Sequence, residues 1–360
     1  MITIRQATLA DKAAIFDFLR LAYAGRWEYK FPHRWEWAFE RNPFWEGEGL
    51  PVWIAVDGPR VVGQSAALVE PLVIRGREYR VGWGVDFFVL PEYRGQGIGT
   101  RLQAANNAGH EVFMSLSMAR SAAVIKSRIG LRPLPPVPVF TRILRHEPDS
   151  VLRTLAARTR LPAGLLRLCG AHRLAAGVLH VRDGFRDRVR RPRPVPGVEL
   201  IPVEVFTEEV DALWQAVSPH FAALVRREAE YLNWKFCQQP HMRHQKAIAR
   251  REGEVCGYVV FRRARPPERN AGVLVDLFAR PDDEGTLCAL AGYALARLRE
   301  QGVSYVTAAS SVPAIQACLL ALGFKQSGAA QPMVRAGVDV PQQGWLLGKG
   351  DHDWDQYPLA

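Results

Sequence analysis

The sequence contains an internal repeat, which limits the folds that this chain can adopt. Four pairs of similar segments occur in the same order, at offsets of 190 to 197 residues: WAFERNP (37–43) with WKFCQQP (234–240), Gly63 with Gly257, VDFF (85–88) with VDLF (275–278), and IGL (129–131) with LGF (322–324). Loop insertions explain the drift in the offset. Similar segments that recur in order indicate duplication of one domain, and not a single large core.

Strand and helix patterns also follow the same order in both copies. In the first copy we expect strands at 2–6, 112–118 and 137–144, helices at 11–23, 100–112 and 121–130, hairpins turning at 57–59 and 75–77, and a long strand ending at Pro91. In the second copy we expect strands at 198–204, 270–281 and 303–309, helices at 207–217, 283–302 and 312–323, and a hairpin turning at Gly253. These patterns predict an α/β fold with a mixed (α+β) sheet in each of two tandem domains, over 1–146 and 197–360. A helical, arginine-rich linker is expected over 147–196.

The composition is typical of a folded protein with two domains. A chain of 360 residues with 48% hydrophobic and 23% charged residues is long enough for two folded domains. It has no apolar run of the roughly 20 residues that a membrane span needs, and its beginning does not resemble a signal peptide. The five cysteines are scattered and match no metal-site spacing, which indicates reduced thiols in a cytoplasm and no bound metal.

The net charge of +11 does not by itself indicate nucleic-acid binding. Only seven of the 47 basic residues are lysine, and the densest arginine stretch, 182–194, is interrupted by aspartates and has no aromatic platform. We expect a solvated linker there and no nucleic-acid partner, with an anionic ligand or a polyanionic acceptor as the alternative. The leucine-rich stretch 149–179 is expected to form two short helices that pack between the domains. The alternative is an amphipathic element on a membrane surface.

The stretch LPEYRGQGIGTRL (90–102) places three glycines at alternate positions between a strand and a helix. A helix that begins after such a turn presents unpaired backbone N–H groups, and residues without a Cβ atom let an anion approach them closely. The spacing does not match a Rossmann fingerprint, and the Gly-Lys-Ser/Thr of a phosphate loop is missing. The pattern that does stand here is Arg94-x-x-Gly97-x-Gly99, directly after a strand.

This pattern resembles motif A of the GNAT superfamily of acyl-CoA-dependent N-acyltransferases, and the element order of 1–145 agrees with the GNAT fold. The resemblance implies that acetyl-CoA is the co-substrate and that residues Gly95 to Thr100 hold its pyrophosphate. It also implies that strand backbone pairs with the pantetheine arm and that an amide near Phe88 or Val89 polarises the thioester carbonyl. The implied cofactor-binding residues are Phe87, Phe88, Val89, Arg94, Gly95, Gln96, Gly97, Ile98, Gly99 and Thr100.

Asp86 is the candidate base for removing a proton from the acceptor amine. It lies on the strand beside the expected thioester end, between aromatic residues that are expected to raise its pKa. The alternative is a structural carboxylate, held by backbone amides where the strands separate or paired with a nearby arginine. Asp276 at the repeated position of the second copy favours this structural role.

Lys126 is the candidate acid. The resemblance implies a tyrosine proton donor four residues before the glycine that closes the next helix, and this position is Lys126 in the first copy and Leu319 in the second. The departure leaves Lys126, Ser121 or solvent to protonate the leaving thiolate.

The second copy lacks the glycine row. It reads ARPDDEGTLCALAG (279–292), and Asp282, Asp283 and Glu284 would repel a pyrophosphate. We therefore expect this half to bind no coenzyme A, and to shape the acceptor site or complete a pseudo-dimer.

The aromatic segment after the first helix is the candidate acceptor site. Its residues that are not repeated in the second copy are Trp27, Glu28, Tyr29 and His33. Clustered aromatic rings and carboxylates suit a cationic amine or a sugar face. Trp37 and Phe39 recur in the second copy and are expected in the core, and GDHDWDQ (350–356) is expected to be a solvated tail.

The sequence thus predicts a cytoplasmic N-acetyltransferase that transfers an acetyl group directly to the primary amine of a small molecule or peptide. It is expected to act without a membrane partner, as a monomer containing a pseudo-dimer of two domains or as a homodimer. Two alternatives stay open: a Fem-type aminoacyl transferase for cell-wall peptides, and a non-catalytic acyl-CoA sensor.

Overall fold

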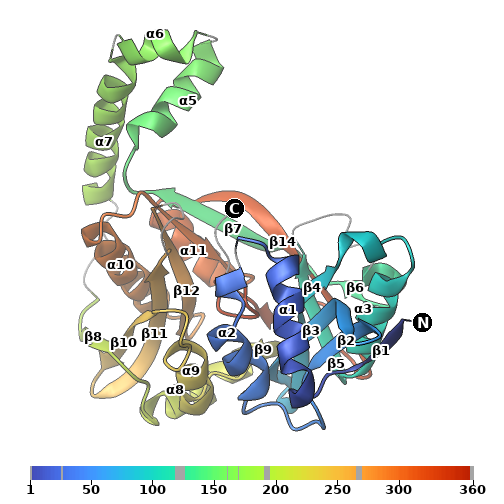
Figure 1. Cartoon of the computed structure of the whole chain (residues 1–360). Coiled ribbons are helices and arrows are strands. Elements are labelled where there is room, and N and C mark those ends of the chain that lie inside the picture. Colours follow the sequence, from blue (N-terminus) through green and yellow to red (C-terminus); the bar gives the residue numbers. More distant parts are fainter. Residues whose placement is uncertain are drawn as a thin grey trace. The chain divides into compact units, whose positions relative to one another are not determined.

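The computed structural model describes residues 2–25, 27–117, 126–159, 161–168, 170–189, 195–264 and 270–356 (Figure 1). The chain forms two compact units, and neither is continuous in sequence. Unit 1 contains Met1–Val137, Glu204–His244 and Ala329–Gln356, and unit 2 contains Pro138–Val203, Gln245–Gly328 and Tyr357–Ala360. Each unit is therefore built from chain of both repeats. The boundaries expected from the sequence describe the duplication and stay a prediction.

Unit 1 is organised around a mixed sheet. Its strands lie in the order β1 (Thr3–Gln6), β2 (Val52–Asp57), β3 (Arg60–Ile74), β4 (Arg77–Val89), β5 (Val112–Ser117) and β14 (Lys325–Ala336). Neighbouring strands are antiparallel except β4 and β5, which are parallel. Three short strands extend this sheet: β6 (Arg132–Pro133) pairs with β14, β9 (Ala223–Val225) with β3, and β15 (Trp345–Leu346) with β9. The mixed sheet confirms the expected fold class.

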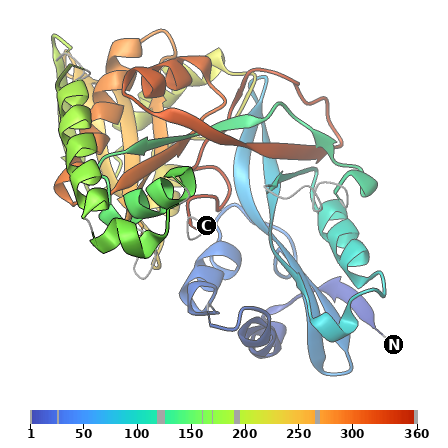
Figure 2. The ribbon, with the colours of Figure 1, turned by 90° about the horizontal axis from the view of Figure 1, so that it is seen from above.

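Helices cover both faces of this sheet. α1 (Lys12–Ala22) and α3 (Ile98–Ala108) lie on opposite sides of β3 and β4 (Figure 2). α3 is tied to the sheet by Asn106, whose side-chain amide donates to Ser65 Oγ and to the Ala66 carbonyl, both at 2.9 Å. The remaining elements of this unit are the short helical turns η1 (Leu9–Asp11), η2 (Trp27–Tyr29), η3 (Glu36–Glu40), η4 (Pro91–Tyr93) and η5 (Ser218–His220), and the helices α2 (His33–Trp35), α8 (Glu209–Val217) and α9 (Ala229–Phe236).

Unit 2 has a second mixed sheet. Its strands lie in the order β7 (Val137–Ile143), β13 (Tyr305–Ala309), β12 (Ala271–Ala279), β11 (Glu254–Arg263), β10 (Gln245–Arg251) and β8 (Val198–Val203). β12 and β13 are parallel and the other pairs are antiparallel. α10 (Glu284–Glu300) packs on β11 and β12, and α11 (Pro313–Ala321) packs on α10.

A helical insert follows β7 in unit 2. It consists of α5 (Pro148–Thr159), α6 (Ala163–Leu168) and α7 (Ala171–Val189), which contact one another (Figure 1). We expected two helices between 149 and 179, and the residues described in this stretch form three, with Pro162 directly before α6 and Gly170 directly before α7. None of the helices in the described ranges is long and apolar enough to cross a membrane.

The two repeats exchange their last strands. β7 ends the first repeat but pairs with β13 in unit 2, whereas β14 follows α11 of the second repeat but pairs with β5 in unit 1. Arg335 on β14 also donates through Nε to Asn107 Oδ1 at 2.6 Å, at the end of α3. A cation there complements the negative end of the helix dipole. The second repeat thus helps to hold the helix that follows the glycine row.

The repeated tryptophans pack on each other inside unit 1. The rings of Trp37 and Trp234 stack with centroids 4.6 Å apart, and Trp37 Nε1 donates to the Trp234 carbonyl at 3.1 Å. Trp37, Trp234 and Phe39 are all buried. The expectation that Trp37 and Phe39 belong to the core is confirmed.

We predict that Trp234→Ala lowers the free energy of unfolding by about 3–5 kcal/mol, because it leaves a cavity beside Trp37. Trp45→Ala is the matched control, since Trp45 is half-buried and its indole donates to the nearby Gly49 carbonyl; it should cost about 1 kcal/mol. Urea unfolding followed by circular dichroism measures both. Equal losses would contradict a core role for the stacked pair.

Candidate functional site: a strand fork and a glycine turn in unit 1

The parallel strands β4 and β5 separate part-way along their length. They pair only from Val81–Trp83 to Val112–Met114, although β4 continues to Val89 and β5 to Ser117. On its other edge, β5 pairs with β14 along its whole length. Among the described residues, β4 has no strand partner on its β5 side beyond Trp83. An open sheet edge can pair with an extended ligand. Two carbonyls of this stretch already have side-chain partners: that of Gly84 lies 3.2 Å from His352 Nε2, and that of Val89 accepts from Arg94.

A bulge marks the same stretch of β4. Ala66 of β3 pairs with Val85, and Gln64 pairs with Phe88, so that two residues of β4 face one residue of β3. Asp86 is one of the two, and its φ of +49° is unusual for a residue with a side chain. The bulge turns the Asp86 side chain away from the regular alternation of the strand.

The glycine turn lies directly after this strand. Gly95 and Gly97 have φ values of +80° and +74°, and a Cβ atom added at either would find no atom within 4 Å. Gly97 caps the N-terminus of α3. The open space in front of them adjoins the first N–H groups of α3, which have no partner within the helix. The turn fits an anion held by backbone donors.

The third glycine serves a different purpose. A Cβ atom at Gly99 would lie 3.1 Å from the ring of Phe87. Gly99 therefore lets the end of β4 approach α3 closely. Of the predicted cofactor residues, Gly95, Gln96 and Gly97 are exposed in the turn and Thr100 is exposed in the first turn of α3, whereas Ile98 is buried and anchors the start of the helix.

Arg94 turns back toward the strand. Its Nε donates to the Val89 carbonyl at 3.0 Å, and its guanidinium lies 5.2 Å from the centre of the Phe88 ring. The ring of Phe88 in turn contacts Phe18 and Tyr23. Arg94 thereby connects the end of β4 to the glycine turn. Its guanidinium also adds positive charge to the exposed side of that turn.

Asp86 is the centre of a buried network of charges. Its carboxylate accepts hydrogen bonds from Lys30 Nζ at 2.6 Å and from Arg34 Nη1 at 2.5 Å. Arg34 also donates to the Asp353 carboxylate at 2.8 Å and to Gln356 Oε1 at 3.0 Å. Lys30, Arg34, Asp86 and Asp353 are all buried. Two cations and two carboxylates therefore compensate one another away from water.

These ion pairs determine the charge of Asp86. Burial alone would raise the pKa of its carboxyl group, but attraction to Arg34 and Lys30 outweighs burial and lowers the pKa of Asp86. The expectation of a raised pKa is wrong, because the two cations outweigh burial. The alternative, a carboxylate paired with an arginine, is what the structure shows. Burial lowers the pKa of Lys30. Lys30 therefore gives up its proton more readily than an exposed lysine does.

The segment 350–356 completes the network, and the expectation of a solvated tail is wrong. Asp351 pairs with Arg227 at 3.0 Å, and Asp355 pairs with His244 at 2.8 Å. Lys235 donates to the His352 carbonyl at 2.6 Å. Asp351, Asp353 and Asp355 are at most 1% exposed. Each aspartate has a basic partner that lies far away in the sequence, so the acidic segment is buried by pairing.

Lys126 lies in a helical turn after β5 and contacts that strand at the fork. Its Nζ donates to Ser115 Oγ, and Ser115 is the first residue of β5 beyond the segment that pairs with β4. Burial lowers the pKa of Lys126 to about 8. Such an ammonium loses its proton near neutral pH. The alternative donor Ser121 lies outside the described residues.

The predicted acceptor residues are neighbours in the sequence of the two buried cations, Lys30 and Arg34. Glu28 and His33 are exposed, Tyr29 is half-buried, and Trp27 packs on Phe31 with ring centroids 5.0 Å apart. Sequence reasoning missed Lys30 and Arg34, which lie between these residues and contact Asp86. The signal that could have identified Lys30 and Arg34 is the presence of two basic residues inside an aromatic-rich segment.

In the second repeat, a carboxylate occupies the position that corresponds to the glycine turn. Asp283 caps α10 by accepting from Thr286 N at 3.0 Å, and it pairs with Arg251 at 2.9 Å. Asp276, the counterpart of Asp86, accepts from Tyr258 Oη at 2.7 Å. Asp283 thus caps the N-terminus of α10 with a carboxylate, whereas Gly97, which has no side chain, caps the N-terminus of α3. Within the described parts of the chain, no group of three metal-ligating side chains occurs.

Comparison with known proteins agrees with this geometry. Residues 3–108 match the family described as Acetyltransferase (GNAT) domain. The greater part of the first repeat is thus similar to the GNAT acetyltransferase domain. No match to the chain was found among curated proteins.

Solved structures show that the GNAT-type fold extends over both repeats. A probable N-acyltransferase from Enterococcus faecalis V583 is 14% identical, with a TM-score of 0.59 over 93% of this chain and 72% of that one. A GCN5-related N-acetyltransferase from Anabaena variabilis is also 14% identical, with a TM-score of 0.57 and the same coverage. The N-myristoyltransferase of Saccharomyces cerevisiae is 11% identical, with a TM-score of 0.57 over 94% of this chain and 80% of that one. Likeness at such low identity concerns the fold alone.

We predict that Asp353→Asn destabilises the protein by about 3–5 kcal/mol at pH 7, because it removes one partner of a buried ion pair. Burial opposes ionisation of Asp353, but His352 and Arg34 outweigh it and lower the pKa of Asp353. A lowered folded-state pKa gives its full stabilisation above the unfolded pKa of about 3.9, and this stabilisation is lost progressively as the pH falls from there toward the folded pKa. The difference between native protein and variant should therefore shrink below pH about 4.

Asp17→Asn is the control for this measurement. Asp17 forms an exposed pair with Arg20 at 2.6 Å, and exposed pairs contribute about 0–1 kcal/mol. Thermal unfolding from pH 2 to 8 compares the variants. A constant loss for Asp353→Asn over this range would contradict the assigned ionisation.

Proposed function

We propose that this protein transfers an acetyl group from acetyl-CoA directly to the primary amine of a small molecule or peptide. One observation carries the proposal: the open edge of β4 leads into the Gly95–Gly97 turn at the N-terminus of α3. The edge suits an extended amide-containing arm, and the turn suits its pyrophosphate. The family match of the first repeat supports the same donor class.

In this proposal the N–H groups of residues 95–100 bind the donor pyrophosphate, and the β4 backbone around Phe87 pairs with the pantetheine arm. The amide of Phe88 or Val89 polarises the thioester carbonyl, where negative charge develops during attack. Acetyl-CoA supplies the acyl thioester when bound. The protein holds that thioester beside the charge network and beside Lys126.

We assign Asp86 to proton removal in this reaction, in one of two ways. As a base in contact with the amine it would be weak, since its pKa is lowered. As a positioning residue it would hold Lys30, whose lowered pKa suits proton transfer. The dependence of the transfer rate on pH in Asp86→Asn distinguishes the two roles. If the fall in rate at acidic pH disappears, Asp86 is the base, and if it moves to another pH, Asp86 positions Lys30.

Lys126 protonates the leaving thiolate in this proposal. It stands where the family resemblance implies a tyrosine, and its contact with Ser115 places it at the base of the fork. Trp27, Glu28, Tyr29 and His33 bind the acceptor amine, with the carboxylate and the rings facing a cation.

We predict that Gly97→Glu abolishes acetyl-CoA binding measured by isothermal titration, because it places a carboxylate at the anion site. Gly58→Glu is a closely matched control. Gly58 also has a positive φ, of +58°, and open space around its absent Cβ, but it lies in the β2–β3 turn. The control should bind acetyl-CoA like the native protein. Native protein that binds no acetyl-CoA would overturn the proposal. Binding without thiol release across a broad panel of amines would indicate a sensor.

We predict that the rate of thiol release falls as the pH rises through about 8, where Lys126 loses its proton. Lys126→Met should remove this limb and lower kcat about 10²–10⁴-fold. Lys325→Met, a change at an exposed lysine of β14, should leave both unchanged. A variant of Lys126 that keeps the alkaline limb would exclude it as the acid.

A further inference from the structure

The helical insert of unit 2 exposes an apolar surface to solvent. Six aliphatic side chains between residues 161 and 181 are 45% to 89% exposed, and we call them the apolar patch: Leu161, Leu165, Leu168, Leu174, Val178 and Val181. Elsewhere in the described parts of the chain, the exposed large hydrophobic residues lie singly. Single exposed apolar residues need no explanation, but a group of them on one small part of a protein marks an interaction surface.

The apolar patch is not the face that the insert uses for its own packing. On α7, Leu174, Val178 and Val181 follow one another at intervals of four and three residues, so they share one face of the helix. Ala176 of α7 and Leu166 of α6 are buried instead. The insert therefore has a second apolar face in addition to its own core, and contact with water makes this face unfavourable.

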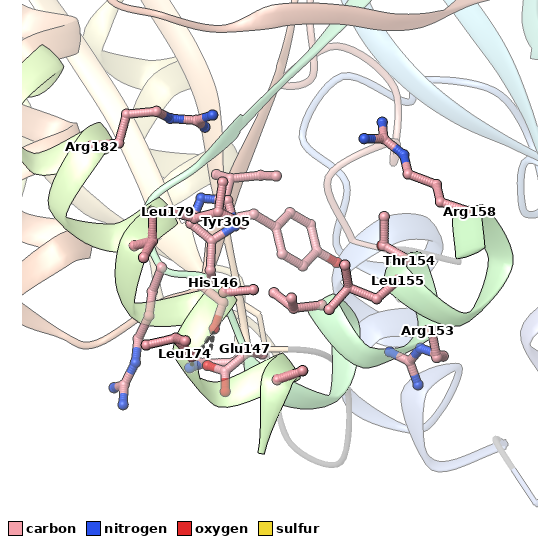
Figure 3. Close-up of a pocket in the computed structure, with 18 of the residues that line it drawn as sticks. His146, Glu147, Arg153, Thr154, Leu155, Arg158, Leu174, Leu179, Arg182 and Tyr305 are labelled. Atoms are coloured by element: carbon pink, nitrogen blue, oxygen red, sulfur yellow. Dashed lines mark hydrogen bonds between the residues drawn. The ribbon is translucent and has the colours of Figure 1, made fainter. Parts of the chain in front are cut away.

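The apolar patch lies on a projecting part of unit 2. Figure 1 shows α6 at the end of the insert that is farthest from the strands of this unit. Leu168, the most exposed member of the patch, is on α6. Leu174 and Leu179 of α7 line an open hollow together with Tyr305 of β13, so that apolar side chains continue from α6 toward the strands (Figure 3). An extended flat surface can therefore reach Leu168 without contacting the sheet of unit 2.

The net charge of the insert is positive. Between residues 148 and 189 the sequence has eight arginines, three aspartates, no lysine and no glutamate. Ion pairs within the insert, such as that of Asp149 with Arg167 at 3.2 Å, do not change this excess of five positive charges. At physiological salt the charge acts over roughly 8 Å. It attracts an anionic surface, and it repels the same face of a second copy of this chain.

We propose that the insert docks on the surface of an anionic lipid bilayer. The apolar patch lies among the acyl chains next to the headgroups, and the arginines lie at the lipid phosphates. A protein partner matches the patch less well, because its members are Leu and Val, whereas Trp and Tyr dominate the binding energy of protein interfaces. The insert lies on the bilayer and does not cross it, since no helix in the described ranges is long and apolar enough.

This proposal takes the second interpretation of residues 149–179 and departs from the expectation that the protein acts without a membrane partner. It is independent of the proposed acyl transfer, because the insert belongs to unit 2, whereas the fork and the glycine turn belong to unit 1.

Sedimentation of the full chain with lipid vesicles tests the proposal. Vesicles of phosphatidylcholine with about 30% phosphatidylglycerol should bind at least about tenfold more tightly than vesicles of phosphatidylcholine alone, because the arginines meet anionic headgroups only in the first. Raising the salt from about 0.05 M to about 0.5 M should weaken this binding at least about tenfold, because salt screens the attraction. Equal affinity for the two kinds of vesicle, or no binding to either, would overturn the proposal.

Matched variants locate the docking surface. Leu168→Asp removes an apolar side chain from the bilayer and places a carboxylate there, so it should weaken vesicle binding by more than about tenfold. Leu320→Asp makes the same change in charge at an exposed leucine of α11, outside the insert, and should leave binding within about twofold of the native protein. Both leucines are exposed, so neither change disturbs a core.

A second pair of variants tests the arginines. Arg173→Gln removes one positive charge from α7 and should weaken binding to the anionic vesicles about threefold to fivefold. Arg297→Gln removes the same charge from α10, which lies in unit 2 but outside the insert, and should have little effect.

Three further outcomes decide against the proposal. Equal losses in Leu168→Asp and Leu320→Asp would show adsorption through the net charge of the whole protein. Binding of soluble polyglutamate as tightly as of the anionic vesicles would indicate an acidic protein partner. A dimer that forms without lipid and is lost in Leu168→Asp would show that a second copy covers the patch. None of these measurements uses acetyl-CoA, so failure of the proposed acyl transfer leaves the result interpretable.

Discussion

The pairing of Arg34 with two carboxylates is the interaction on which the candidate site depends. Arg34 binds Asp86 at the bulge of β4 and Asp353 in the last described segment of the chain. All three side chains are buried, so each charge requires the others. The conformation of the bulge, the position of the aromatic segment and the burial of segment 350–356 are therefore coupled.

This coupling explains why an acidic segment can be buried at all. Burying an isolated carboxylate is strongly unfavourable, and the aspartates of 350–356 enter unit 1 only because Arg34, Arg227 and His244 meet them. The same network sets the charge of Asp86 beside the fork. Structural pairing and candidate chemistry thus use the same atoms, and a change at Asp353 acts on both.

The sequence predicts the parts of this protein that are local. The element order, the duplication and the glycine turn all appear in short stretches whose spacing carries the signal, and the mixed sheet follows from them. Ion pairs between distant segments leave no such signal. Lys30 and Arg34 looked like ordinary basic residues, and DHDWD looked like a solvated tail, because nothing near them in sequence shows which partner they meet. The exchange of β7 and β14 is equally invisible, since either strand is compatible with either sheet.

The exchange of β7 and β14 also gives the second repeat a structural role in unit 1. Its helix α10 begins with the carboxylate of Asp283 where α3 begins with bare glycine, so the same fold position favours an anion in one unit and opposes it in the other. Yet chain from this repeat supplies β14 beside β5, Trp234 beneath Trp37, and the aspartate that pairs with Arg34. The second repeat is therefore required for the first, because unit 1 is incomplete without it.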